Sequence, residues 1–169
     1  MTIEKVIIRK IKDDDYESCM ELLRDFTKES IFTNQYPGQP DKDKKKSCEM
    51  YKDKFRCFLG AFVNSKLIGI CDFFVKWPDH PWSGRNCEFG LCLLKAYTET
   101  NVGRLLMLKL EEEARKKGMH RLYSCVRVKD LCGINLYLSL GYSIDGLAKE
   151  VAFINGKWYD EYYISKLLM

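Results

Sequence analysis

Hydrophobic and polar residues alternate along this chain with two different periods, and each period predicts one kind of secondary structure. Short runs rich in β-branched and aromatic residues are typical of strands, whereas apolar residues three and four positions apart are typical of one helix face. The predicted strands lie at residues 5–11, 58–63, 66–75, 86–94, 121–128, 148–154 and 157–168. The predicted helices lie at residues 16–26, 102–117 and 131–140, and residues 44–56 are weakly helical. This order predicts an α/β (α+β) fold with a mixed sheet.

Turn-forming residues separate these elements. Asn64-Ser65 and Asn155-Gly156 each stand between two strand runs and predict tight hairpin turns. The four prolines fall in two longer stretches, residues 31–41 and 76–86, and both are predicted to be loops. We expect the second stretch to form a long exposed hairpin loop. Gly141 directly follows a helical run and is expected to end it.

The charges at the end of the helix predicted at 102–117 follow a regular pattern. Three glutamates each precede a basic residue by four positions, which predicts three ion pairs along the helix. The pairs are Glu111 with Arg115, Glu112 with Lys116, and Glu113 with Lys117. Gly118 is expected to end this helix.

Length and composition limit the classes of protein that the chain can belong to. With 169 residues, 46% of them hydrophobic, residues 1–169 are expected to form one globular domain with a substantial core. No run of about 18 apolar residues is present, so no membrane span is predicted. A net charge of +4 is too small to predict nucleic-acid binding. No signal peptide is recognisable, so we expect a cytoplasmic protein.

Cysteine and histidine do not point to a metal site. The eight cysteines and two histidines lack the spacing of zinc or redox motifs, so no bound metal is expected. Cys92 and Cys125 lie on predicted strands with no histidine nearby in sequence to activate them. We therefore expect the cysteines to remain reduced, most of them as small core residues.

The start of the helix at residue 102 is a candidate anion site. A helix that begins just after a strand presents unpaired N–H groups and a partial positive charge. Gly103 allows close approach to the backbone, and Arg104 adds a full charge. Most helix starts bind nothing, so this observation is weak on its own.

Three segments resemble one family. Residues 91–106 resemble the pyrophosphate-loop segment of the GNAT acyl-CoA N-acyltransferases, which has the pattern [QR]-x-x-G-x-[GA] before a leucine-bearing helix. Residues 126–142 are similar to the family segment that ends in L-Y-x-x-x-G-[FY], and residues 155–163 are similar to its N-G-K-Y-x-D-E-Y-Y hairpin. The first segment departs from the pattern, because Thr98 replaces Gln or Arg and Asn101 replaces the first Gly. Glu99 also stands where Gly is frequent, and a carboxylate beside a pyrophosphate would repel it.

The resemblance implies a fold and a co-substrate. The fold would be a central twisted mixed sheet flanked by helices, and the co-substrate would be acetyl-CoA. The pantetheine arm would lie between the strands at 87–94 and 121–128, and the pyrophosphate would lie on the amides of residues 100–104. The residues implied for cofactor binding are Leu91, Leu93, Leu94, Thr98, Glu99, Thr100, Asn101, Val102, Gly103, Arg104, Asp130 and Tyr137.

The resemblance also implies direct attack of an amine on the thioester. The amine must lose a proton and the departing thiolate must gain one. Glu88 is the candidate base. The alternative interpretation is that Glu88 is an ordinary exposed strand residue. Tyr137 is the candidate acid, although a tyrosine on a short helix can serve only in packing.

The acceptor is less well defined by the sequence. The first expectation is a primary amine of a small molecule, such as a polyamine, an amino-sugar or an amino acid derivative. Two alternatives are acetylation of a protein N-terminus or lysine, and a non-catalytic module that binds or senses CoA. Residues 27–40 and 76–86 are expected to flank the amine pocket. His80 is more simply interpreted as a surface residue than as a base. A homodimer is compatible with the resemblance, and no nucleic-acid or membrane partner is expected.

Overall fold

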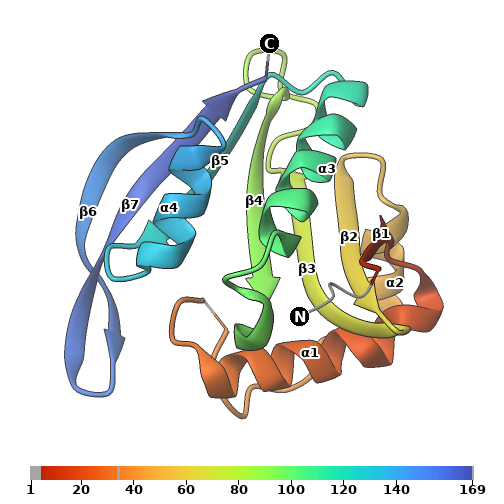
Figure 1. The fold of residues 1–169 in the computed structure, drawn as a ribbon. Helices are drawn as coiled ribbons and strands as arrows, with labels where there is room; N and C mark the ends of the chain where they lie inside the picture. Colours follow the sequence, from red (N-terminus) through yellow and green to blue (C-terminus); the bar gives the residue numbers. More distant parts are fainter. Residues whose placement is uncertain (1–4, 34, 169) are drawn as a thin grey trace.

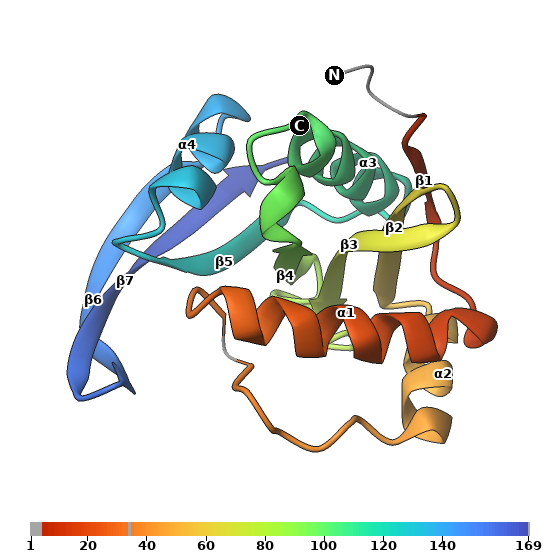
Figure 2. The same ribbon diagram turned by 60° about the horizontal axis from the view of Figure 1, so that its bottom comes forward.

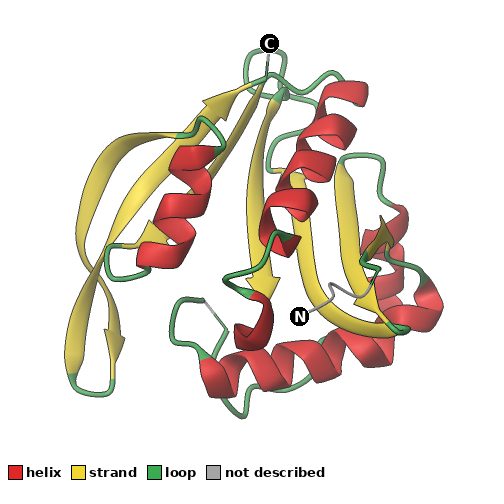
Figure 3. Ribbon diagram, viewed as in Figure 1, coloured by secondary structure: helices red, strands yellow, loops and turns green. Residues whose placement is uncertain are grey.

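The computed structural model describes residues 5–33 and 35–168, and it confirms the predicted order of the elements. Figures 1 and 3 show a single sheet with helices on both sides. The elements are β1 (Ile7–Lys10), α1 (Tyr16–Glu29), α2 (Lys44–Lys52), β2 (Arg56–Val63), β3 (Lys66–Val75), β4 (Asn86–Leu93), α3 (Val102–Lys116), β5 (Arg121–Arg127), α4 (Leu131–Ser139), β6 (Ser143–Ile154) and β7 (Lys157–Leu167). Two short 3₁₀ turns, Asp13–Asp15 and Lys95–Tyr97, precede α1 and α3.

The seven strands form one mixed sheet in the order β1-β2-β3-β4-β5-β7-β6. All neighbouring strands are antiparallel except β4 and β5, which are parallel. The β4–β5 ladder holds only three residue pairs, and the last of them joins Glu88 to Tyr123. Beyond this pair the two strands diverge, as Figure 1 shows in the centre of the molecule. The sheet therefore opens into a V whose vertex lies at Glu88.

The helices cover the two faces of the sheet unequally. Figure 2 shows α1 along one face, with α3 and α4 on the other. Leu106, Met107 and Leu110 of α3 are fully buried in the larger core, together with Phe73 and Leu122 of the sheet. A smaller core lies under α1 and contains, among others, Cys19, Met20, Leu22, Phe62 and Leu67. The helical spacing of apolar residues in α1 and α3 thus predicts correctly which side of each helix is buried.

The predicted turns are present. Asn64 and Ser65 have φ angles of 47° and 66°, and Asn155 and Gly156 have φ angles of 50° and 76°. Two consecutive residues with positive φ define the type I′ turn, whose twist suits a two-residue hairpin. Gly118 and Gly141, at φ 72° and 86°, end α3 and α4 in the left-handed conformation as expected.

Strand β6 begins at Ser143, five residues before the predicted start at 148. The register between β6 and β7 shifts twice, between Ile144 and Gly146 and between Ala148 and Ala152. Bulges of this kind break the alternation of inward and outward side chains. Since that alternation is the signal used to find a strand, the first part of β6 escapes the prediction.

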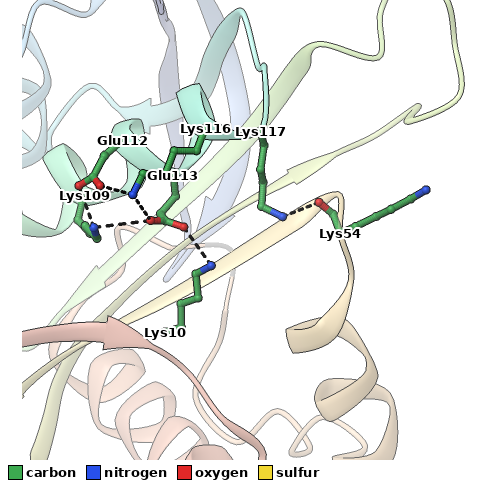
Figure 4. Close-up of polar contacts among 7 residues, drawn as sticks. All are labelled: Lys10, Lys54, Lys109, Glu112, Glu113, Lys116 and Lys117. Carbon is green, nitrogen blue, oxygen red and sulfur yellow. Dashed lines mark hydrogen bonds and ion pairs between the residues drawn. The ribbon is translucent and has the colours of Figure 1, made fainter.

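The charge pattern at the end of α3 is confirmed for two pairs and wrong for the third. Glu111 pairs with Arg115 at 3.2 Å, and Glu112 pairs with Lys116. Glu113 instead contacts Lys10 at 3.0 Å, while the Lys117 ammonium donates to the Lys54 carbonyl at 2.6 Å (Figure 4). Glu113 lies on the side of α3 that packs near β1, with its side chain 10% exposed, so it finds a partner across the fold.

Glu111 is also more buried than an ordinary surface pair requires. Its side chain is 2% exposed, and Lys166 of β7 donates to both carboxylate oxygens at 2.8 and 2.7 Å. A buried carboxylate needs such compensation for the loss of water. The pair therefore fastens α3 to β7, in addition to the hydrophobic contacts between them.

The expectation that most of the cysteines are core residues is met only in part. Cys19, Cys57, Cys71 and Cys87 are buried, whereas Cys132 is exposed, and all the cysteines are free thiols.

Within residues 5–33 and 35–168, no helix has both the length and the apolar character needed to span a membrane.

Candidate active site

The V between β4 and β5 is the central feature of the candidate site. At its vertex the Ser124 hydroxyl donates to the Phe89 carbonyl at 2.8 Å, so the carbonyl of residue 89 points toward β5. Backbone groups two residues apart point to the same side of a strand. The N–H and C=O of Leu91 therefore point into the open part of the V, where β5 does not pair with β4. These are the groups expected to hold an extended ligand, and that pairing stays a prediction.

A cavity of about 580 Å³ opens at the carboxyl end of β4, between α3 and α4. It brings together eight of the twelve predicted cofactor-binding residues. These are Leu91, Leu93, Thr98, Glu99, Thr100, Gly103, Asp130 and Tyr137. The segments that carry them are far apart in the sequence, so the cavity joins the first two family-like segments in space.

The other four predicted residues do not line this cavity. The amide of Leu94 donates to the Ile68 carbonyl at 3.0 Å, which completes the sheet, and Val102 is 3% exposed in the core. The Arg104 guanidinium donates to the Ser139 hydroxyl at 3.4 Å, and Ser139 is at the edge of the cavity lining. Asn101 has φ −75°, so the loop forms without the left-handed conformation that its asparagine would tolerate.

The loop before α3 is held by its own threonines. The hydroxyl of Thr98 donates to the Lys95 carbonyl at 2.9 Å, and the hydroxyl of Thr100 donates to the Tyr97 carbonyl at 2.6 Å. Thr100 Oγ1 also accepts from the Val102 amide at 3.3 Å. The next two amides, of Gly103 and Arg104, have no acceptor among the described residues. The helix N-terminus therefore keeps free donors beside the cavity.

Gly103 is needed for close packing between α3 and α4. A Cβ atom at this position would lie 3.2 Å from Leu136 Cδ2, tighter than ordinary van der Waals contact. The absence of a side chain thus lets the first turn of α3 approach α4 and places both helices around the cavity.

Asp130 has a structural role that the sequence analysis does not anticipate. It is the N-cap of α4, and its Oδ1 accepts from the Gly133 amide at 2.9 Å. Burial raises the pKa of the Asp130 carboxyl above its ordinary value, although the bond from Gly133 opposes this effect. The other oxygen, Oδ2, makes no hydrogen bond to a described residue, and Asp130 is one of the residues that line the cavity.

Tyr137 lies deep in the cavity wall, between two other aromatic rings. Its ring centroid is 5.4 Å from that of Phe89 and 5.8 Å from that of Tyr142. The hydroxyl has no hydrogen-bond partner among the described residues, and burial raises the pKa of Tyr137 well above its ordinary value. A buried phenol of this kind keeps its proton at neutral pH and has it available for donation.

Glu88, the predicted base, lies on the opposite face of β4 from Phe89 and does not line the cavity. It stands at the vertex of the V, opposite Phe74 of β3 and Tyr123 of β5. A second carboxylate on this face, Asp72 of β3, was not singled out by the sequence analysis. Burial raises the pKa of Asp72 to about 6. Its only sequence signal is an acid within the apolar strand run at 66–75.

The end of α1 also contributes to the cavity without having been predicted to hold the cofactor. Phe26, Glu29, Ser30 and Phe32 line the wall opposite α4. Glu29 Oε2 accepts from the Lys95 amide at 3.0 Å, which ties α1 to the loop before α3. Glu29, Ser30 and Phe32 of the stretch 27–40 thus border this cavity, while the expectation that the stretch flanks the amine pocket stays a prediction. Tyr36 lies instead in a separate pocket of about 270 Å³ against α1.

The loop at 76–86 does not border this cavity, and its expected place beside the amine pocket stays a prediction. It joins β3 and β4 at the end where Val75 pairs with Cys87, whereas the cavity lies at the other end of β4. Figure 1 shows this loop near the C-terminus, away from α1. His80 Nδ1 accepts from the amides of Trp82 and Ser83 at 3.3 and 3.2 Å. This contact agrees with the interpretation of His80 as a surface residue.

Comparison with known proteins places this geometry in a family context. The model of the Acetyltransferase (GNAT) family matches residues 16–142. The chain is 25% identical to spermidine N(1)-acetyltransferase from Thermoplasma acidophilum over 155 aligned positions, and the match covers 86% of this chain and 91% of that protein. It is 22% identical to the L-amino acid N-acetyltransferase AaaT from Escherichia coli over 173 aligned positions, covering 98% of this chain and 99% of that protein.

Solved structures show the same fold. The chain superposes on an acetyltransferase of the GNAT family from Streptococcus pneumoniae with a TM-score of 0.89 at 22% identity, covering 98% of this chain and all of that chain. It superposes on yncA from Salmonella typhimurium, solved with its cofactor acetyl-CoA, with a TM-score of 0.83 at 19% identity. That match covers 97% of this chain and 94% of the other.

Proposed function

This chain belongs to the GNAT family of acetyltransferases, and on that premise we propose that it moves the acetyl group of acetyl-CoA to a primary amine of a small molecule. The observation that carries the proposal is the V between β4 and β5. Its open part presents the unpaired backbone of Leu91, and the cavity beside it is lined by Tyr137.

The cavity offers acetyl-CoA backbone groups along β4 and at the start of α3. The arm would extend along β4 as an added strand, with Leu91 and Leu93 as its backbone partners. The pyrophosphate would lie at the start of α3, where the amides of Gly103 and Arg104 are free. Glu99 also lines the cavity, and its negative charge opposes the pyrophosphate. Binding therefore depends on the backbone donors more than on side-chain charge.

Transfer then requires two proton movements. The amine nitrogen attacks the thioester carbon, so a C–N bond forms and the C–S bond breaks. The nitrogen gives up a proton to a base, and the departing thiolate takes the proton of the Tyr137 hydroxyl. Asp72 of β3 and Glu88 of β4 are the candidates for the base, because both carboxylates lie on the α1 face of the sheet.

The acceptor class follows from the charge of this face and from the relatives. Two carboxylates at the vertex of the V favour a cationic amine over a neutral acceptor. The curated relatives are named for spermidine and for L-amino acids, which are both small molecules that carry amines. We therefore place small amines first and protein N-termini or lysines second.

A thermal-shift titration with acetyl-CoA is the first test, with adenosine 3′,5′-bisphosphate as the comparison ligand. At a hundred times its dissociation constant, a ligand adds about 2.7 kcal/mol to the free energy of unfolding. We expect a saturable rise in Tm, followed by thiol release when small amines are screened. The presence of Glu99 in the cavity favours the alternative of a weakly binding, non-catalytic module. A flat titration up to millimolar acetyl-CoA would support that alternative against the enzyme.

A further inference from the structure

We propose that Asp72 of β3, rather than Glu88 of β4, is the group that accepts the proton of the attacking amine. The inference rests on the proposed function, because it assigns a residue to the acetyl transfer described above. It is drawn from the position of the Asp72 carboxylate beside Gly90, at the point where β4 leaves β5.

The register of β3 and β4 places Asp72 directly opposite Gly90. Side chains of directly opposed residues lie on the same face of an antiparallel pair. At position 90 there is no side chain, and a Cβ atom built there would lie 3.1 Å from Asp72 Oδ1. The carboxylate therefore lies against the β4 backbone at Gly90, in a place that a side chain at position 90 would crowd.

The Asp72 carboxylate thus lies where the reaction would take place if the arm of acetyl-CoA follows β4. Gly90 stands between Phe89, whose carbonyl is held by Ser124 at the vertex, and Leu91, whose backbone points into the V. The thioester is the leading end of the arm, so it would reach this vertex. An amine that approaches from the α1 face would pass the Asp72 carboxylate just before it meets the thioester carbon.

The Asp72 carboxylate is free to accept a proton because no described residue pairs with it. Among the described residues it forms no ion pair and no hydrogen bond through its side chain. Its opposite neighbour on β2 is Phe58, which offers no polar contact. A partly buried carboxylate without a partner is costly to a fold, and such groups are concentrated at functional sites.

The charges around Asp72 set the pH range in which it can act. Burial raises the pKa of Asp72 to about 6, and Glu88 adds to the rise. Lys42, before α2, and Arg56, on β2, lower this pKa; Arg56 also pairs with Asp53 at 3.4 Å and lies over the Phe74 ring. Cys92 lies on the same face of β4, and burial raises the pKa of its thiol to about 12, so it stays neutral. Asp72 is therefore ionised at neutral pH and able to take a proton.

The ammonium form of the acceptor first releases one proton to solvent, because only the neutral amine has the electron pair that attacks. As the nitrogen attacks the thioester carbon, its next proton passes to an oxygen of Asp72 and the electron pair of the C–S bond leaves with sulfur. The sulfur takes the proton of the Tyr137 hydroxyl. Solvent then removes the proton from Asp72 and returns one to Tyr137, so that the enzyme regains its starting state.

The test compares Asp72→Asn with Glu88→Gln in thiol-release assays from pH 5 to 9, using the small amine that the wild type turns over fastest. We expect Asp72→Asn to lower kcat by roughly ten- to ten-thousand-fold and to abolish the acidic limb of the kcat/KM profile. Glu88→Gln should keep the limb and move its midpoint to lower pH, because it removes a charge that raises the pKa of Asp72. The rise in Tm caused by acetyl-CoA should be unchanged in both variants.

The outcomes separate this inference from the function on which it rests. A limb that survives in Asp72→Asn, or one that disappears in Glu88→Gln, would overturn the assignment of Asp72 while leaving the acetyl transfer intact. A wild-type protein that binds acetyl-CoA but acetylates no amine would overturn the proposed function, and this inference with it. Asp72→Glu serves as a second variant, since a carboxylate retained at this position should preserve the limb.

Discussion

An unpartnered carboxylate in the sheet has a consequence for stability that can be measured without any substrate. The pKa of Asp72 rises from an ordinary 3.8 to about 6 on folding, chiefly because of burial. A pKa that is higher in the folded state means that the folded protein prefers the neutral acid. The preference costs little below the unfolded pKa of 3.8, where the acid is mostly neutral in both states; its cost grows as pH rises from there to about 6 and is constant above.

The size of the effect follows from the same pair of values. Each pKa unit corresponds to about 1.4 kcal/mol, so ionised Asp72 destabilises the folded state by up to about 3 kcal/mol above pH 6. Replacing Asp72 by Asn removes the charge at nearly constant volume. We therefore expect the variant to gain up to about 3 kcal/mol over the wild type at pH 7.5, or roughly 6 to 12 °C in Tm, relative to the difference between them at pH 4.

The assay is thermal and urea unfolding of both proteins at several pH values between 4 and 8. Asp79→Asn, on the exposed loop at 76–86, is the matched control, because it removes the same charge from a solvated position. The pH-dependent gain should be confined to Asp72→Asn. A difference between wild type and Asp72→Asn that stays constant from pH 4 to 8 would refute the reasoning, since the carboxylate would then have found a compensating partner.

Three further changes test other parts of the site. Tyr137→Phe should reduce turnover by roughly ten- to ten-thousand-fold with little effect on acetyl-CoA binding, and unchanged turnover in a thiol-release assay would remove Tyr137 from the role of acid. Glu99→Gly should tighten acetyl-CoA binding about two- to five-fold by calorimetry, because it takes a negative charge away from the start of α3; weaker binding would mean that the loop needs the carboxylate. Gly133→Ala should cost about 1 kcal/mol of unfolding free energy, because its Cβ would lie 2.5 Å from Asp130 Oδ2 and disturb the cap of α4. An unaltered urea midpoint in Gly133→Ala would show that Asp130 can move aside.

Turns and helix ends could be predicted from the sequence, because residues next to each other in the chain determine them. The turn at Asn155-Gly156 is an example, because two residues that tolerate positive φ between two strand runs leave few alternatives. The ends of α3 and α4 at Gly118 and Gly141 have the same local cause. In contrast, Glu113 could not be paired correctly from its spacing, since its partner Lys10 comes from a strand that the fold brings beside α3.

The cavity shows the same division between local and long-range information. Thr98 to Gly103 lie in one continuous loop, and their position beside the cavity follows once the helix after them is recognised. The loop at 76–86 lies away from this cavity, and composition alone does not say at which end of a sheet a hairpin loop falls. The direction of β4 decides this question. Its carboxyl end meets α3, so the loop at its amino end is necessarily at the opposite end of the sheet.

The choice between Asp72 and Glu88 as the base depends on how distant strands pair in the sheet. In the sequence, Glu88 is the better candidate, because it precedes the predicted cofactor loop on the same strand. Asp72 gains its position only from the register of β3 on β4, which sets it opposite a residue without a side chain. A register shifted by one residue would turn Asp72 to the other face, into the core under α3. The position of the proposed base is therefore a property of the sheet. The pH dependence of unfolding in Asp72→Asn tests the burial of this carboxylate independently of any acceptor amine, and the pH–rate profile tests its role as base.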